Sequence, residues 1–400
     1  MKISVLDAPS AYGRFHKRRN RFVVELEIDG TATTASLPNP GRMQELLLPG
    51  VELGVVPGPA GGRHPWKVRS LRTRDATVPL DTGAGNQVAA RLIDGGMVPG
   101  LEGWRVLRSE VVPPGLHSRF DFLLCRRDDP RSQRYLEVKS CTLFNGEWAF
   151  FPDAVSDRAR RHVEELVSAG ASTGVPGVVL VLVHSSAVRF FSPDVHVDLA
   201  FSRTLAEHRD ALELIPLGLC WDAQLSLAAA PRRLRVPWER ILPAMDDRGS
   251  YLILLELPHP RRITVGALGT RDFPAGFYVY VGSAQRGLSR RIARHRRKRG
   301  SSLHWHVDYL RREASVVDSW AIREPYRREE EIAGAVAALA ERSEPNFGSS
   351  DSSRESHLFY WSTDPRRNRS FQELILELRR FGFTAPRSPG PPPKRSPEFD

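Results

Sequence analysis

A continuous apolar run at residues 176–183, PGVVLVLV, constrains the fold of this chain more than any other segment. The run has the length of a strand, and its lack of polar side chains predicts burial on both faces. The preceding segment, residues 155–170, predicts an amphipathic helix that Gly170 ends. Its apolar stripe comprises Val155, Ala159, Val163, Leu166 and Val167. A strand expected at 134–143 precedes this helix, and strand–helix–strand in this order predicts a right-handed crossover and a parallel sheet.

The flanking segments extend this α/β pattern. We expect a helix at 86–96, with an Asn cap and a Gly stop, and strands at 104–112 and 119–125 before the crossover. A helical stretch near 198–213 and a strand at 215–221 follow it.

The first part of the chain has a different period. From residue 14 to about 83, apolar and polar side chains alternate, and Gly/Pro clusters separate the runs. Several short strands at this spacing predict a small β-barrel of the five-stranded oligonucleotide/oligosaccharide-binding (OB) kind. Such a barrel is a candidate nucleic-acid-binding module.

Charged residues on two neighbouring strands of the α/β part form a candidate catalytic site. Asp121 lies in SRFDFLL, where we expect Phe120 and Phe122 on the opposite side of the strand. Glu137 and Lys139, in YLEVKS, leave one face of the next strand. Two carboxylates bind a hard cation such as Mg²⁺ or Mn²⁺, and a lysine orients water and stabilises charge on a phosphate. The spacing fits the PD-(D/E)xK nuclease pattern, whereas the Glu-x-Lys pair alone would indicate an exposed ion pair.

Four longer motifs resemble the sugar fermentation stimulation protein family over roughly residues 12–225: LPNPGRMQELLLPG, SRFDFLL, YLEVKS and FFPDAVSDRARRHVEEL. That family resembles a small barrel joined to a PD-(D/E)xK core, and has been described both as DNA-binding and as nuclease-like. The resemblance implies metal-binding roles for Asp121 and Glu137, and catalytic roles for these two residues and Lys139.

The same resemblance implies further contacts with the substrate. It places the helix that carries Arg158 and His162 beside the scissile phosphate, although ordinary helix surface stays open for both. In the barrel motif it implies a structural turn at residues 39–41 and a phosphate contact by Arg42.

The last third of the chain predicts a second site. Tyr251 lies on a first strand, Tyr280 on a second, and an arginine-rich helix follows with Arg291 and, one turn later on the same face, His295. With HWHVDYL and NFGSSDSSRESHLFYW, these motifs resemble a GIY-YIG nuclease-like branch of unknown function, over about residues 249–365. The resemblance implies catalytic roles for Tyr251, Tyr280 and Arg291. Core aromatics are the alternative for the tyrosines.

The metal ligand of the second site is left open by the sequence. The resemblance implies a glutamate on a later helix, and both Glu329 and Glu331 lie at the start of one. His304 and His306 have an alternating spacing, but no cysteine or further histidine joins them at zinc-ligand spacing. We therefore expect structural histidines there.

The distribution of charge indicates a polyanionic partner. The chain of 400 residues has a formal net charge of +11, and residues 286–299 contain eight Lys or Arg and no acid. A solvated helix usually interleaves acids, so this segment predicts contact with nucleic acid. The residues expected to bind it are Arg42, Arg158, His162, Arg290, Arg294 and His295.

Neither a run of 18 apolar residues nor the apolar centre of a signal peptide is present, and the three cysteines form no CxxC pair. We expect a soluble cytoplasmic protein without a membrane partner, a disulfide scaffold or a cysteine-built zinc site. The expected partner is DNA, and both RNA and a homodimer stay open.

The sequence thus predicts a multidomain α/β (α+β) protein with Mg²⁺ or Mn²⁺ as cofactor. The expected parts are an OB-like barrel (1–85), a PD-(D/E)xK nuclease-like domain (86–230), a linker (231–248), a GIY-YIG-like domain (249–385) and a disordered tail (386–400). The expected function is metal-dependent hydrolysis of phosphodiester bonds. The alternative is a non-catalytic DNA-binding regulator of sugar catabolism genes.

Overall fold

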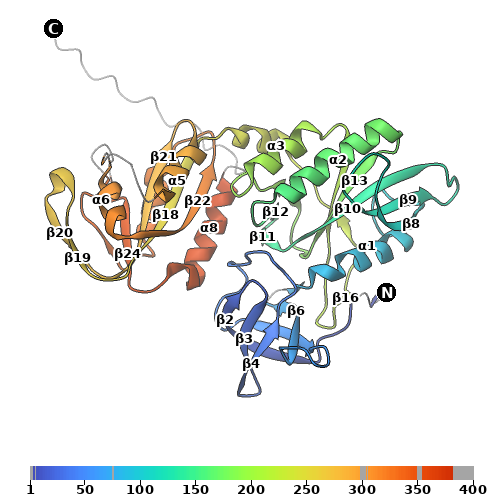
Figure 1. Ribbon diagram of the computed structural model, residues 1–400, viewed down its shortest axis with the longest axis horizontal. Coiled ribbons are helices and arrows are strands. Elements are labelled where there is room, and N and C mark those ends of the chain that lie inside the picture. Colours follow the sequence, from blue (N-terminus) through green and yellow to red (C-terminus); the bar gives the residue numbers. More distant parts are fainter. Residues whose placement is uncertain are drawn as a thin grey trace, which may run out of the picture.

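The structure is a computed structural model that describes residues 3–4, 6–73, 76–297, 303, 305–348 and 354–381. Figure 1 shows an N-terminal barrel below a central α/β domain, with a C-terminal α+β domain that lies next to the central domain and also contacts the barrel. The predicted tail, 386–400, lies outside the described residues. None of the helices in the described ranges combines the length and apolar character that crossing a membrane requires.

The N-terminal domain is the predicted β-barrel. Its strands are β2 (Ala11–Asn20), β3 (Val23–Ile28), β4 (Thr31–Ser36), β5 (Glu52–Pro57), β6 (Trp66–Arg72) and β7 (Thr77–Pro79), in the order β4-β3-β2-β5-β6-β7. An additional parallel pairing of β4 with β6 closes the barrel. Alternate side chains, such as Leu26 and Ile28, point into one apolar core, which is the physical cause of the period-two pattern.

The central domain is built on a six-stranded sheet. Its order is β17 (Arg232–Arg233), β15 (Leu212–Gly218), β13 (Gly177–Val183), β10 (Gln133–Cys141), β9 (Phe120–Arg126) and β8 (Trp104–Val111). β10, β13 and β15 are parallel, and β8, β9 and β10 are antiparallel. All of β13 is buried, as the apolar run predicted.

Helices cover both faces of this sheet (Figure 1). α1 (Gly85–Asp94) packs on one face, against a core that includes Leu136 and Val138. α2 (Asp157–Thr173) and α3 (Leu199–Glu207) pack on the other. A smaller sheet of β11 (Leu143–Asn145), β12 (Trp148–Phe151) and β14 (Phe190–Pro193) adjoins them, and β1 (Ile3–Ser4) pairs with β16 (Ser226–Leu227).

The crossover helix α2 ends later than the sequence indicated. Ser156 caps its start by accepting the Ala159 N–H, at 3.1 Å. The helix continues past Gly170, because it is Gly174, with φ of +71°, that takes the left-handed conformation of a C-terminal cap. The expected glycine stop was therefore one turn too early.

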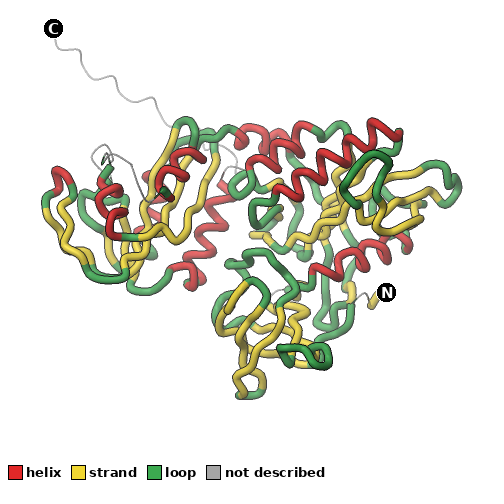
Figure 2. Tube along the Cα trace, viewed as in Figure 1, coloured by secondary structure: helices red, strands yellow, loops and turns green. Residues whose placement is uncertain are grey.

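The C-terminal domain has a five-stranded sheet between two helical layers. The order is β22 (Ser315–Arg323), β18 (Gly249–Leu257), β21 (Gly276–Ala284), β24 (Leu358–Trp361) and β23 (Arg342–Ser343), and β19 (Arg261–Thr264) and β20 (Thr270–Phe273) form a separate hairpin. α5 (Leu288–Arg296) and α6 (His306–Glu313) cover one face, and α7 (Glu329–Ala337) and α8 (Arg369–Phe381) the other. Figure 2 shows this helix–sheet–helix layering.

The segment between the two α/β parts is packed, although the sequence predicted a linker with little core of its own. It contains the short helix α4 (Trp238–Ile241). Ile241, Ala244 and Met245 are buried in one cluster with Leu376 of α8 and with residues of β11 and β12. These side chains fill the junction between the two domains.

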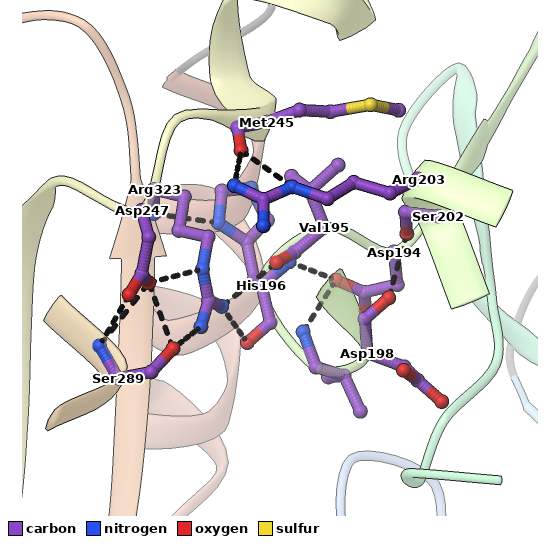
Figure 3. A network of polar contacts seen from close by, with 11 residues as sticks. Asp194, Val195, His196, Asp198, Ser202, Arg203, Met245, Asp247, Ser289 and Arg323 are labelled. Atoms are coloured by element: carbon purple, nitrogen blue, oxygen red, sulfur yellow. Dashed lines mark hydrogen bonds and ion pairs between the residues drawn. The ribbon is translucent and has the colours of Figure 1, made fainter. Parts of the chain in front are cut away.

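A buried polar network joins the same two domains (Figure 3). At its centre is Arg323, at the end of β22, which is 6% exposed. Its guanidinium donates to the carbonyl oxygens of Val195 and His196, at 2.7 and 2.8 Å, and to Oγ of Ser289, at 2.9 Å. It also lies 3.4 Å from a carboxylate oxygen of Asp247. Because each donor of a buried arginine needs an acceptor, this network fixes the two domains in one arrangement.

His196 is the second bridge of this interface. Its Nδ1 accepts the backbone N–H of Arg323 at 2.9 Å, so the ring proton lies on Nε2, which donates to the carbonyl oxygen of Arg379 at 3.0 Å. Burial, together with the charges of Arg379 and Arg323, lowers the pKa of His196 to about 3. The imidazole therefore stays neutral in the folded protein.

This neutrality predicts a pH-dependent stability. The ordinary histidine pKa is 6.5; below it, the unfolded chain binds a proton that the folded chain excludes, so the contribution of His196 is complete above pH 6.5 and is lost as the pH falls toward 3. Between pH 7.5 and 5.5, the free energy of unfolding should fall by about 1.4 kcal/mol more in the wild type than in His196→Gln. Urea unfolding of both proteins at the two pH values measures this, and equal losses would contradict it.

Candidate active site and nucleic-acid interface

The first candidate site begins where two strands separate. The pairing of β9 with β10 ends at Phe122 and Leu136. One residue further, Oδ2 of Asp121 accepts the backbone N–H of Val138 at 2.7 Å. The carboxylate thus replaces a ladder hydrogen bond that the separating strands no longer make, and it is held between them.

The end of this pairing also corrects one expectation. Phe120 and Phe122 do not share a side of β9: Phe120 packs in the core under α2, with its ring 5.6 Å from that of Tyr135, and Phe122 packs in the core under α1. Before Phe122, β9 pairs with β8 but no longer with β10. The side chains there are therefore not held to the alternation that pairing with β10 imposes.

Glu137 and Lys139 lie on one face of β10, as their spacing predicted. Oε1 of Glu137 accepts from Nζ of Lys139 and from Nδ1 of His162, both at 2.5 Å. Glu137 is only 4% exposed, and among the described residues none donates to its second oxygen, Oε2. A buried carboxylate oxygen left in this way costs free energy unless something else binds it.

The electrostatics of the two carboxylates differ. Burial, and then the charge of Glu137, raise the pKa of Asp121 above its ordinary value, against the hydrogen bonds from Val138 and Asn86. Burial also acts on Glu137, but the hydrogen bond from His162 and the charge of Lys139 outweigh it and lower its pKa. Asp121 and Glu137 repel each other, and Oε2 of Glu137 is buried without a donor from the described residues. A divalent cation bound through the carboxylate oxygens would relieve both conditions.

The described residues hold no cluster of three or more His, Cys, Asp or Glu side chains that could bind a metal ion. A magnesium ion commonly keeps several waters and takes only one or two carboxylates, with substrate phosphates completing its shell. The carboxylates of Asp121 and Glu137 are therefore enough protein ligands for a magnesium ion.

Helix α2 supplies two predicted residues with different placements. His162 is buried and donates to Glu137, so it holds a carboxylate and does not line the surface. Arg158 is exposed, and its Nε donates to Nε2 of His162 at 3.4 Å. Of the two, Arg158 is therefore the one whose side chain is open to solvent.

Asn86 is a site residue that the sequence analysis assigned only as a helix cap. The helix starts at Gly85, and the amide nitrogen of Asn86 donates to Oδ1 of Asp121 at 2.7 Å. The bond spans 35 residues, so no local pattern indicates it. Asn86 positions Asp121 for the site.

The second candidate site is a cavity of about 1000 Å³ in the C-terminal domain. Tyr251, Tyr280, Arg291, Glu329 and Glu331 all line it, so the fold brings these five predicted residues together. Its size is at the upper end of the usual range for ligand pockets.

The two tyrosines form the floor of this cavity. Oη of Tyr251 lies 3.0 Å from Nε2 of His295. Tyr251 stands directly opposite Gly282, where any Cβ would lie 2.5 Å from the phenol ring, so the ring requires glycine at that position. Burial raises the pKa of both Tyr251 and Tyr280 well above the ordinary value, so both are hydrogen-bond donors at neutral pH.

The two glutamates differ in their surroundings. Glu329 is half-buried; it accepts from Oγ of Ser283, and its Oε1 lies 3.2 Å from Nδ1 of His357. Burial opposes its ionisation, but these hydrogen bonds lower its pKa. Glu331 is exposed in the same first turn of α7 and pairs with Arg328 at 2.5 Å. Glu329 is the more preorganised carboxylate of the two.

The basic helix α5 divides its predicted nucleic-acid contacts between surface and interior. Arg290 is exposed. Arg294 is bound to the buried carboxylate of Asp308 at 2.6 Å. His295 is 1% exposed beneath Tyr251, and burial lowers its pKa to about 4. His295 is thus placed to orient Tyr251 and does not reach the surface.

Of the two histidines of HWHVDYL, the structure describes His306. Nδ1 of His306 accepts the backbone N–H of Gly348 at 3.0 Å. His304 lies outside the described residues.

Comparison with known proteins agrees with this architecture. Residues 17–79 match the SfsA N-terminal OB domain, and residues 83–224 match the Sugar fermentation stimulation protein RE domain. Sugar fermentation stimulation protein homologs from Methanothermobacter thermautotrophicus and Pyrobaculum arsenaticum are each 35% identical to this chain, over 241 and 235 residues. The matches cover 98% and 97% of those proteins, and 60% and 56% of this chain. The chain belongs to the sugar fermentation stimulation protein family.

A solved structure of this family and a further domain model complete the comparison. The structure of Pyrococcus furiosus SfsA in complex with Ca²⁺ is 26% identical, with a TM-score of 0.52, and the match covers 99% of that chain and 59% of this one. Residues 250–380 match the domain of unknown function DUF123.

The barrel motif of this family member forms a turn that contacts both other domains. Oδ1 of Asn39 accepts the backbone N–H of Gly41 at 2.9 Å, and a Cβ at Gly41 would lie 2.3 Å from a carboxylate oxygen of Asp153. The exposed Arg42 lies 3.6 Å from Asp318 of the C-terminal domain. Arg42 lines a cavity of about 370 Å³ between the domains, and Arg296 of α5 lines the same cavity.

Proposed function

We propose that this member of the sugar fermentation stimulation protein family is a nucleic-acid-binding, metal-dependent nuclease that hydrolyses phosphodiester bonds at Asp121, Glu137 and Lys139. The observation that carries the proposal is the buried Oε2 of Glu137, to which none of the described residues donates, beside a second carboxylate whose pKa is raised. The Pyrococcus furiosus SfsA structure is a complex with Ca²⁺, which supports a divalent-cation site in the same family.

Each residue has a defined task in this proposal. A bound Mg²⁺ or Mn²⁺ supplies Lewis-acid chemistry and lowers the pKa of a bound water. Asn86 and the Val138 N–H hold Asp121, and His162 holds Glu137. The ammonium of Lys139 orients the attacking water and stabilises the charge that develops on the phosphate. Arg158, exposed above His162, binds a phosphate oxygen.

The C-terminal cavity is proposed as a second nucleic-acid site of the GIY-YIG-like kind. Arg291 contacts a phosphate, Tyr251 and Tyr280 donate hydrogen bonds, and Glu329 is the metal ligand in preference to Glu331. The proposal is supported by the convergence of these residues on one cavity and by the lowered pKa of Glu329. DNA is the expected partner, and RNA is tested beside it.

A cleavage panel tests the proposed function. We expect purified protein to cut at least one of single-stranded, duplex or branched DNA, or RNA, with Mg²⁺ or Mn²⁺ and not with EDTA. Ca²⁺ should raise the unfolding temperature in the absence of nucleic acid, because binding to the folded state alone stabilises it. Salt-dependent DNA affinity that EDTA leaves unchanged, without any cleavage product, would instead support the non-catalytic regulator.

A further inference from the structure

The cavity of the C-terminal domain has an aromatic side chain at its edge that none of the roles above uses. Trp305 lines the cavity and is 39% exposed. Large aromatic side chains are usually buried, so an exposed indole beside a charged cavity points to a binding role.

Trp305 is held in place by its neighbours. Its backbone N–H donates to Oδ2 of Asp308 at 3.0 Å. Asp308 is itself buried and pairs with Arg294 at 2.6 Å and Arg311 at 3.0 Å. The backbone of Trp305 is therefore tied to an ionic cluster at the start of α6, which limits the backbone entropy lost when a ligand binds to the indole.

The indole is also next to the cation of the site. The guanidinium carbon of Arg291 lies 5.3 Å from the centroid of the Trp305 ring, within the range of a cation–π contact. Arg291 also acts on the phenol of Tyr251, whose pKa its charge and hydrogen bond lower against the larger effect of burial. Arg291 thus interacts with both Tyr251 on the floor of the cavity and Trp305 at its edge.

The charges that line the cavity suit a phosphodiester. Five arginines line it, at 286, 291, 327, 328 and 354, against three glutamates at 329–331. A phosphate bound by Arg291 would place the adjoining nucleoside beside Trp305. In an intact duplex that base is paired and stacked inside the helix, and an indole outside the backbone does not reach its face.

We propose that the C-terminal cavity binds an unpaired nucleotide of single-stranded or distorted nucleic acid, with its phosphate on Arg291 and its base stacked on Trp305. This inference rests on the proposed nucleic-acid binding of the cavity and adds the substrate class. Stacking on an aromatic side chain is tolerant of sequence, because every base has a flat face. The site therefore recognises the unpaired state and not a base sequence.

A pair of oligomers with equal charge tests the stacking. Binding of fluorescein-labelled dT12 and of an abasic dodecamer with the same phosphates is measured by fluorescence anisotropy on the full chain, with Ca²⁺ present. We expect Trp305→Ala to weaken dT12 binding about tenfold, because one stacked base contributes about 1–3 kcal/mol. Binding of the abasic oligomer should change less than twofold, and Trp305→Phe should retain most of the affinity for dT12.

Two further variants separate the possible failures. Tyr326→Ala removes an exposed aromatic residue that does not line the cavity, and should change neither affinity. Arg291→Ala should weaken both oligomers, since both carry the phosphates. If Trp305→Ala leaves dT12 binding unchanged, or weakens both oligomers equally, the stacking proposal is overturned while cavity binding stands. If Arg291→Ala changes neither affinity, nucleic-acid binding by the cavity is overturned as well.

Discussion

Cleavage by Lys139→Met is expected to fall about 10²–10³-fold, while the protein still binds a divalent cation. Methionine keeps an unbranched apolar side chain but removes the ammonium that lies 2.5 Å from Glu137. In the proposed mechanism this ammonium acts on water and on the phosphate, whereas Asp121 and Glu137 hold the metal. Cleavage rates with Mg²⁺ and the Ca²⁺-induced rise in unfolding temperature measure the two roles separately.

Matched substitutions make this result specific. Lys17→Met removes an exposed lysine that pairs with Glu25 at 3.3 Å in the barrel, and should leave cleavage within about twofold. Asp121→Asn should abolish cleavage and diminish the response to Ca²⁺, because it removes a proposed ligand of this site and leaves Glu329 of the C-terminal domain in place. Cleavage that persists in both Lys139→Met and Asp121→Asn would remove this site from the reaction.

The second large effect concerns the interface between the central and C-terminal domains. Arg323→Ala is expected to weaken this interface by about 3 kcal/mol, because the buried carbonyl oxygens of Val195 and His196 and the carboxylate of Asp247 lose their shared donor. Amide hydrogen exchange at Val195, Val197 and residue 323 should accelerate about a hundredfold, since 1.4 kcal/mol corresponds to a factor of ten.

A surface arginine of the same domain is the control. Arg262 is exposed and lies 3.8 Å from Asp272, so Arg262→Ala should leave exchange at the interface unchanged, as exposed pairs contribute little. Equal exchange rates in the wild type and Arg323→Ala would show that the buried apolar cluster around Ile241 and Leu376 holds the domains together without this network.

Local periodicity accounts for the parts that the sequence predicted well. Residues 177–183 of the apolar run form a buried strand because β13 is parallel to its neighbours and covered on both faces. Glu137 and Lys139 share a face because the side chains of a strand alternate with period two. The barrel and the crossover helix α2 belong to the same category, because each follows from alternation within its own elements. The convergence of Tyr251, Tyr280 and Arg291 on one cavity was instead expected from the resemblance to the GIY-YIG-like branch.

The tertiary structure alone decided how these elements complete one another. It formed the hydrogen bond between Asn86 and Asp121, which are 35 residues apart, and the one between His162 and Glu137, which are 25 apart. It also joined His196 to the backbone amide of Arg323, 127 residues away. It also buried His295, which the charge of its helix had indicated as a surface residue. The sequence by itself determined the strands, helices and charged faces, because these follow from backbone geometry and local side-chain alternation. Which buried donor meets which acceptor depends on packing between distant segments, and no local pattern encodes it.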